Sequence, residues 1–227
     1  MNYLLEVCLL AVALAASIPS APQAMRKGIS VELPPTSHAV PMPDADEADS
    51  LIVSVTNDGR VYFGVDQVSP ASLSEKVKGR LSNRAEKQLY IKADVRTPYA
   101  NVAKVLDAVR TAGVEAPIFL TAQRDASEPS TLVPPKGLET LMASPSASQS
   151  TVVQLLSSGQ PTPMLKINNH PIPWTDLQST LRQVVQSRTE QVVLVKADGR
   201  LPFSSVVNVI DMCRSTGAKV ALALSGE

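Results

Sequence analysis

Few residues in this chain are of the types that perform catalysis or bind metals. Its 227 residues include two histidines and two cysteines. His38 lies in a proline-rich stretch and His170 in an expected hairpin turn, and neither has the neighbours of a Ser-His-Asp arrangement. We expect both to be solvated. Cys8 and Cys213 make no disulfide framework, and there is no metal-spaced cluster or phosphate-binding loop. We therefore expect no enzymatic activity, cofactor or metal.

The carboxyl group of Glu6 is the exception, because it lies inside an apolar stretch, residues 3–18. An ionised carboxylate in hydrocarbon is costly, so such an acid is normally protonated, paired or functional. Residues 1–24 fit a retained transmembrane anchor, slightly short for a bilayer core of about 30 Å. Small residues such as Ala21 and Ala24 also fit a cleaved signal peptide, although its positive N-terminal region is missing. Composition alone leaves both interpretations open.

The rest of the chain contains an internal repeat with an offset of 104 residues. Matched pairs include Asp94 with Asp198, Arg96 with Arg200, Pro98 with Pro202, and Tyr99 with Phe203. Residues 65–121 align with residues 169–225 without a gap. The sequence therefore predicts two copies of one structural unit.

Each copy is predicted to be a small α+β domain with the order β-β-α-β-α-β. Alternating apolar residues predict strands, and apolar residues at four-residue spacing predict helices. In the first copy, residues 51–122, we expect strands at 51–55, 60–65, 89–93 and 116–121, and helices starting at Pro70 and at Pro98. In the second, residues 151–227, we expect strands at 152–156, 164–168, 191–197 and 219–224, and helices at 173–186 and 203–216.

Proline-rich stretches separate these units. Residues 25–50 combine prolines with acids, and residues 123–150 combine prolines with serines. Both are expected to be semi-rigid or disordered spacers. The charges of the whole chain balance, with 21 basic and 21 acidic residues, which argues against nucleic acid as the main partner.

Acids also recur in the two copies. Asp94 and Asp198 each follow a predicted strand, where an aspartate normally accepts hydrogen bonds from the backbone of a turn. Partner recognition is the alternative role. Each second helix carries an Asp and an Arg three residues apart, expected to be solvated pairs: Asp107 with Arg110, and Asp211 with Arg214.

Three stretches of the chain resemble the ExbD/TolR family, the single-pass subunits of proton-driven motor complexes. Residues 4–10 resemble the start of the family's membrane helix, with Glu6 in place of its Asp. Residues 29–34 resemble its Val-acid-Leu-Pro segment, and residues 92–102 resemble its basic-small-Asp and Pro-Tyr pattern. The resemblance covers nearly the whole chain, with the domain counted twice.

The resemblance implies a single-pass protein of the cell inner membrane, with the bulk of the chain in the periplasm. It implies that Glu6 carries protons inside a pore formed by a polytopic ExbB/TolQ/MotA-like partner. It also implies a homodimer that acts on a TonB/TolA-like protein or on peptidoglycan. The residues it points to for partner binding are Val31, Glu32, Leu33, Pro34, Asp94, Tyr99 and Asp198.

An alternative function remains open. The chain would then be an exported periplasmic tandem adaptor that binds peptidoglycan or a partner protein without conducting protons. Whether the two copies pair with each other is also open, since pairing depends on surfaces that the repeat does not reveal.

Overall fold

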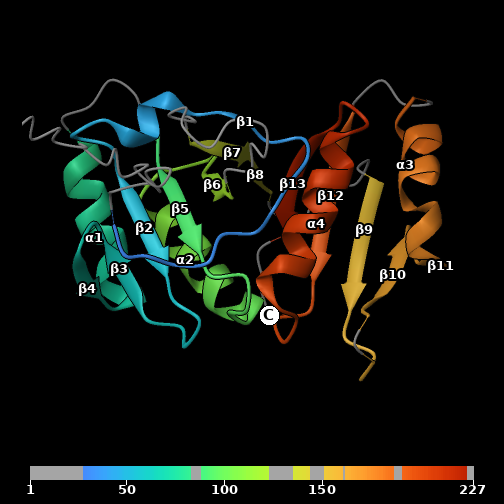
Figure 1. Cartoon of the computed structure of the whole chain (residues 1–227), viewed down its shortest axis with the longest axis horizontal. Coiled ribbons are helices and arrows are strands. Elements are labelled where there is room, and N and C mark those ends of the chain that lie inside the picture. The colour runs from blue at the N-terminus through green and yellow to red at the C-terminus, as the bar shows by residue number, and fades with distance from the viewer. Residues whose placement is uncertain are drawn as a thin grey trace, which may run out of the picture.

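The computed structural model describes residues 28–82, 88–122, 135–143, 151–160, 162–186 and 191–223. These residues form two mixed β-sheets that lie side by side, each with helices packed on one face (Figure 1). The fold is therefore mixed α/β, with the duplicated organisation that the repeat predicts.

Sheet 1 holds the first copy and has the strand order β1-β7-β6-β5-β2-β3-β4. Its strands are Val40–Pro41 (β1), Ile52–Val55 (β2), Val61–Phe63 (β3), Asp66–Val68 (β4), Tyr90–Ala93 (β5), Ile118–Thr121 (β6) and Lys136–Glu139 (β7). Its helices are Pro70–Leu81 (α1) and Tyr99–Thr111 (α2).

Sheet 2 holds the second copy and has the strand order β11-β10-β9-β12-β13-β8. Its strands are Leu141–Ala143 (β8), Thr151–Leu156 (β9), Met164–Ile167 (β10), His170–Ile172 (β11), Val192–Ala197 (β12) and Lys219–Ala223 (β13). Its helices are Leu177–Gln186 (α3), which follows a 3₁₀ turn at Trp174–Asp176 (η2), and Phe203–Arg214 (α4).

The two copies share one topology. The strand order β6-β5-β2-β3-β4 of the first copy corresponds to β13-β12-β9-β10-β11 of the second. Each copy has one strand more than predicted, β4 or β11, so the order is β-β-β-α-β-α-β. The prediction missed these strands because each has only three residues, too few to show an alternating pattern, and follows a two-residue turn. Asn168 and Asn169 form one such turn with φ of 47° and 71°, as two-residue hairpin turns require.

The ungapped alignment of the copies is wrong in the last strand. Tyr90 and Leu194 correspond at an offset of 104, but Tyr90 faces Ile118 whereas Leu194 faces Ala221, an offset of 103. The connection before β13 is therefore one residue shorter than the connection before β6. Because side chains alternate between the faces of a strand, this shift changes which residues point toward the helices.

The start of α1 confirms the predicted helix signal. Ser69 Oγ accepts a hydrogen bond from the N–H of Ser72 at 3.2 Å, and Pro70 follows in the first turn. The apolar residues at four-residue spacing, Leu73, Val77 and Leu81, are buried against the sheet.

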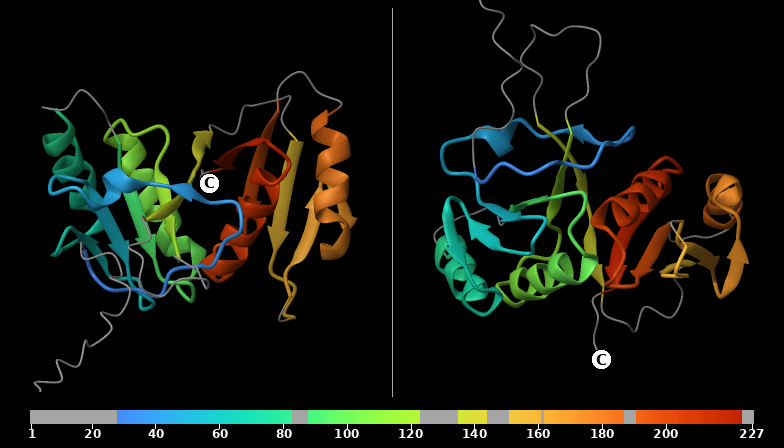
Figure 2. Two further views of the ribbon diagram at one scale, coloured as in Figure 1. Left: turned by 45° about the horizontal axis from the view of Figure 1, so that its top comes forward. Right: turned by 60° about the horizontal axis from the view of Figure 1, so that its bottom comes forward.

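Residues 28–50, expected to belong to a spacer, instead form a strap across sheet 1. The strap contains β1 and the 3₁₀ helix Pro43–Asp46 (η1). Its buried Ala45, with Leu33 and Met42, packs on a cluster of sheet residues: Ile52, Tyr90, Ile118 and Leu120. The right view of Figure 2 shows the strap on one face of sheet 1 and α1 and α2 on the other. Apolar residues scattered among its prolines and acids explain the packing.

The second expected spacer also contributes structure, because part of it joins the two sheets. Within residues 123–150, β7 pairs antiparallel with β6, and β8 pairs parallel with β13. Thr140 is the one residue between β7 and β8. A single extended segment thus ties the first copy to the second.

The N-terminal apolar segment, including Glu6, lies outside the described residues. Among the helices of residues 28–223 that the structure does describe, none combines the length and apolar character needed to cross a membrane.

Candidate functional site

The two copies meet along a seam formed by residues 95–100 and 199–204. Four backbone hydrogen bonds cross it: Tyr99 N–H to Leu201 O at 2.8 Å, Phe203 N–H to Thr97 O at 2.9 Å, Ala100 N–H to Gly199 O at 2.9 Å, and Ser204 N–H to Val95 O at 3.0 Å. Under the offset of 104, these bonds form two symmetric pairs. Pro98 and Pro202 face each other at the centre. The copies therefore pair within one chain about a local two-fold axis, which answers the question left open by the sequence.

Side chains from both copies form one core behind the seam. The rings of Phe119 and Phe203 have centroids 5.2 Å apart and are tilted by 59°. Gly199 approaches the opposite copy so closely that a Cβ atom on it would lie 2.9 Å from the Cβ of Ala100. A backbone this close to its neighbour requires glycine.

Tyr99, which the resemblance pointed to for partner binding, lies inside this shared core. It is 1% exposed, and burial raises the pKa of its phenol, with a further contribution from the charge of Asp107. Its hydroxyl has no hydrogen-bond partner among the described residues. In this conformation the ring supports the seam and is closed to an outside partner.

Asp94 stands beside the seam and organises a turn. Its carboxylate accepts hydrogen bonds from Arg96 Nε at 2.9 Å and Nη2 at 3.0 Å, and from the Arg96 N–H at 3.1 Å. The hydrogen bonds from the Arg96 side chain hold the pKa of Asp94 below its ordinary value, although burial opposes them. Asp94 thus remains ionised near neutral pH while 4% exposed.

The strap is attached at this turn. The Glu32 N–H donates to Asp94 Oδ2 at 3.3 Å, and the Glu32 carbonyl accepts the N–H of Val95 at 2.9 Å. The carbonyl of Pro34 accepts the N–H of Ala122. The Val-acid-Leu-Pro segment, residues 31–34, is therefore brought together with Asp94. The resemblance pointed to both for partner binding and did not predict this contact within the chain.

Asp198 builds the equivalent turn in the second copy. Arg200 donates to its carboxylate from Nη2 at 2.6 Å and from Nε at 3.0 Å. These bonds hold the pKa of Asp198 well below its ordinary value. The side chain of Asp198 is 20% exposed, against 5% for Asp94, because the strap covers only the first turn.

The strap also reaches the second copy, through residues that sequence reasoning assigned to solvent. The N–H groups of Ser37 and His38 donate to the carboxylate of Asp211 at 3.0 and 2.8 Å, and His38 Nδ1 lies 3.2 Å from Asp211 Oδ2. Figure 1 shows the blue segment crossing sheet 1 and turning back beside α4. The expectation that Asp211 is a solvated acid is wrong, since its side chain is 10% exposed. Long-range contacts of this kind leave no local signal in a sequence.

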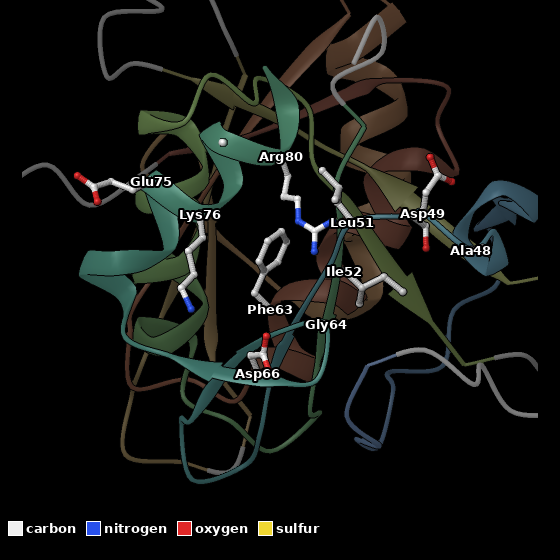
Figure 3. Close-up of a pocket in the computed structure, with 12 residues that line it drawn as sticks. Ala48, Asp49, Leu51, Ile52, Phe63, Gly64, Asp66, Glu75, Lys76 and Arg80 are labelled. Atoms are coloured by element: carbon white, nitrogen blue, oxygen red, sulfur yellow. The ribbon is translucent and has the colours of Figure 1, made fainter. Parts of the chain in front are cut away.

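A cavity of about 430 Å³ lies at the other end of the first copy, where no motif marked it. Figure 3 shows the side chains of Phe63, Lys76 and Arg80 around it, with Asp66 below them. Its acidic and basic groups occur together, so no single ligand charge is favoured. Among the residues that the structure describes, no group of His, Cys, Asp or Glu is arranged to hold a metal ion.

Comparison with known proteins gives two tandem matches to one family. The family described as "Biopolymer transport protein ExbD/TolR" matches residues 7–124 and residues 118–226. A Pseudomonas aeruginosa protein named "Biopolymer transport protein ExbD" is 26% identical over 99 residues, which cover 44% of this chain and 72% of that protein. The two family matches agree with the two copies in the structure.

Proposed function

This chain belongs to the ExbD/TolR family of biopolymer transport proteins, and on that basis we propose that it is a membrane-anchored component of a transport complex driven by the proton-motive force. Residues 1–24 are its anchor and the two copies are its periplasmic part, in the inner membrane of the cell. We assign no enzymatic step to the chain. The proposal concerns the transmission of movement from the membrane to the paired copies.

One observation carries the proposal, namely that the strap is fixed to both copies. Residues 31–34 are bound at Asp94 in the first copy, and residues 37–38 at Asp211 in the second. The strap is also the described segment closest in sequence to the apolar N-terminus. A pull or rotation at that end would act on the seam from both sides.

Glu6 supplies the driving step in this proposal. It is alternately protonated and ionised as protons move down their gradient. Moving one charge through the membrane potential is worth about 2.3 kcal/mol per 100 mV, comparable to the free energy of a few hydrogen bonds. Glutamate and aspartate have similar reference pKa values, about 4.3 and 3.9, so Glu6 is suited to the same proton chemistry as the family's aspartate.

The proposed partners follow from the family. A polytopic ExbB/TolQ/MotA-like protein would surround the N-terminal helix, and a TonB/TolA-like protein or peptidoglycan would contact the paired copies. We expected a homodimer from the resemblance. Because the seam is already filled within one chain, we propose that any pairing of chains uses a different surface.

Replacing Glu6 by Gln tests the proposal. We expect Glu6→Gln to abolish proton-linked transport in cells while membrane insertion and expression remain unchanged, and Glu6→Asp to retain transport. Full transport by Glu6→Gln would contradict the proton step. The mass of the mature N-terminus provides a second test, because cleavage near Ala21 or Ala24 would support the exported adaptor instead.

A further inference from the structure

The outer faces of the two sheets, opposite the helices, carry equivalent rows of residues. In sheet 1, Lys92 faces Ser54, which faces Tyr62. In sheet 2, Lys196 faces Gln154, which faces Lys166. The central lysine thus occurs at the same position in both copies, but the surroundings differ.

In the first copy, the strap covers this row. Lys92 is 3% exposed and Ser54 is fully buried. Burial lowers the pKa of Lys92, while the charge of Asp46 in the strap opposes that shift. An acidic, proline-containing segment is therefore the natural occupant of this face in sheet 1.

In the second copy, the corresponding face is open at the lysines and closed around Leu194 and Ala221, which are 2% and 3% exposed. Lys196 is exposed and Lys166 is half-buried, and Lys219, which faces Val192 toward the other end of the sheet, is also exposed. None of them forms an ion pair with a described residue. Leu156 and Met164, which face each other across β9 and β10, are 36% and 45% exposed. This face therefore combines unpaired positive charge with exposed apolar surface.

The turn beside this face has the same form in the second copy, but no strap residue is bound to it, and a hydrogen bond from the backbone of Ser157 reaches Asp198 instead. In the first copy, the N–H of Val95 donates to the carbonyl of Glu32 in the strap. Gly199 holds the equivalent position in the second copy, and no described residue accepts a hydrogen bond from its N–H. Asp198 and Arg200 keep the same geometry as Asp94 and Arg96.

We propose that the outer face of sheet 2, from the turn at Asp198 to Lys166, binds an extended segment of a partner protein with the chemistry of the strap. That segment has a Leu-Pro-type apolar anchor at the turn, followed by acidic residues over Lys196 and Lys166. The inference rests on the proposed action through a periplasmic partner and is independent of the proton step.

Stoichiometry favours a partner protein over a second copy of this chain as the occupant. Each chain has one strap but two equivalent outer sheet faces that could bind such a segment. We call each of these faces, centred on Lys92 in sheet 1 and on Lys196 in sheet 2, a seat. The strap is required at sheet 1, where it buries Lys92 and contacts Asp94 and Asp211. A second copy of the chain would have to expose its own sheet 1 in order to fill the seat on sheet 2.

A peptide with the strap's own sequence, residues 28–50, is the probe for this seat. The full chain, kept in mild detergent, is titrated against the fluorescent peptide and binding is followed by anisotropy. We expect saturable binding that weakens at least tenfold in Lys166→Glu/Lys196→Glu. Replacing four of the peptide's five acids, Asp44, Asp46, Glu47 and Asp49, by their amides should weaken binding to a similar extent.

The matched control is Lys78→Glu/Lys104→Glu, which reverses two exposed lysines on the helices of the first copy. It should bind the peptide as the unmodified chain does. Equal binding by both double variants, or no binding by the unmodified chain, would overturn the proposal. Concentration-dependent dimerisation that the peptide does not compete with would assign the seat to a second copy and overturn it as well. Because Glu6 takes no part in this assay, its outcome is separate from the test of the proton step.

Discussion

The two copies differ most in what lies over the outer face of their sheets. In the first copy, Ile52, Tyr90 and Ile118 fill the space beneath the strap, and each is 2–3% exposed. The register places Val152, Leu194 and Ala221 at the corresponding positions of the second copy. No described strap lies above these smaller side chains, although Leu194 and Ala221 are also only 2% and 3% exposed. The copies are thus alike where they build the turn and the seam, and different where the first copy holds its own N-terminal segment.

This difference indicates a division of roles within one chain. The first copy is fixed to the strap, so it is suited to receive movement from the N-terminal segment. The second copy shares the seam but keeps its turn and its lysines accessible, so it is suited to contact another protein. Variants at the seam, at the strap contacts and at the two turns test this division of roles.

Removing the ring of Phe203 should have the largest effect. It is fully buried and packs against Phe119 of the other copy, so Phe203→Ala should cost about 3–5 kcal/mol of unfolding free energy. Urea unfolding followed by circular dichroism measures this cost. The control is Phe63→Ala, a half-buried ring at the far end of the first copy, which should cost clearly less. Equal losses would contradict a shared core at the seam.

Releasing the strap from the second copy should have the next largest effect. Asp211→Ala removes a carboxylate that accepts two backbone N–H groups, and we expect a loss of about 1.5–3 kcal/mol. Asp107→Ala, at the matched position in the first copy, should change stability by less than about 0.5 kcal/mol. Faster hydrogen exchange at Ser37 and His38 in the first variant alone would confirm the attachment. Unchanged exchange there would contradict it.

Acid sensitivity should also distinguish the copies. Hydrogen bonds from Arg96 and Arg200 lower the pKa values of Asp94 and Asp198 from the ordinary 3.8, so the stability they contribute is present above that value and is lost as the pH falls below it. The pKa of Asp198 is lowered further than that of Asp94, but the Asp198 side chain is 20% exposed against 5%, so screening by solvent reduces the stability that its ionised form contributes. We therefore expect Asp94→Asn, which also releases Glu32, to reduce the acid loss more than Asp198→Asn. Unfolding measured between pH 6 and pH 2 tests the order, and the reverse order would show that the larger pKa shift of Asp198 outweighs its exposure.

The smallest effect concerns the hydroxyl group by which Tyr99 differs from Phe203, its counterpart in the second copy. The Tyr99 hydroxyl is buried without a partner among the described residues, whereas the second copy has phenylalanine at this position. Tyr99→Phe should therefore stabilise the protein by about 1 kcal/mol. A rise in the melting temperature is the expected observation, and a fall would mean that the hydroxyl makes a favourable contact.

The sequence revealed the repeat and most strands and helices because periodic apolar patterns are local. It missed β4 and β11 because such short strands carry almost no periodicity, although the Asn168-Asn169 pair is a turn signal. It treated the strap as a spacer because prolines and acids outnumber its apolar anchors, Leu33, Met42 and Ala45.

The candidate site was predictable only in part. The family resemblance selected Asp94 and the segment at residues 31–34 for binding a partner, whereas the structure shows them bound to each other, which the sequence did not predict. The contact between His38 and Asp211 spans 173 positions, and nothing local to either residue signals it. The seam likewise depends on how two distant turns meet, although its residues, Pro98 and Pro202 above all, are among those that repeat.

The pairing of the two copies within one chain can be tested most directly with a disulfide across the seam. The double variant Pro98→Cys/Pro202→Cys, in a Cys8→Ser background, joins residues that face each other in the antiparallel bridge at the centre of the seam. Directly opposed residues of an antiparallel pair have Cβ atoms about 4.5–5.5 Å apart, close to the separation of about 3.5–4.5 Å that a disulfide needs. Oxidation should give a disulfide inside single chains, and coexpressed single variants should remain unlinked. A disulfide that joins two chains, in either experiment, would contradict the account.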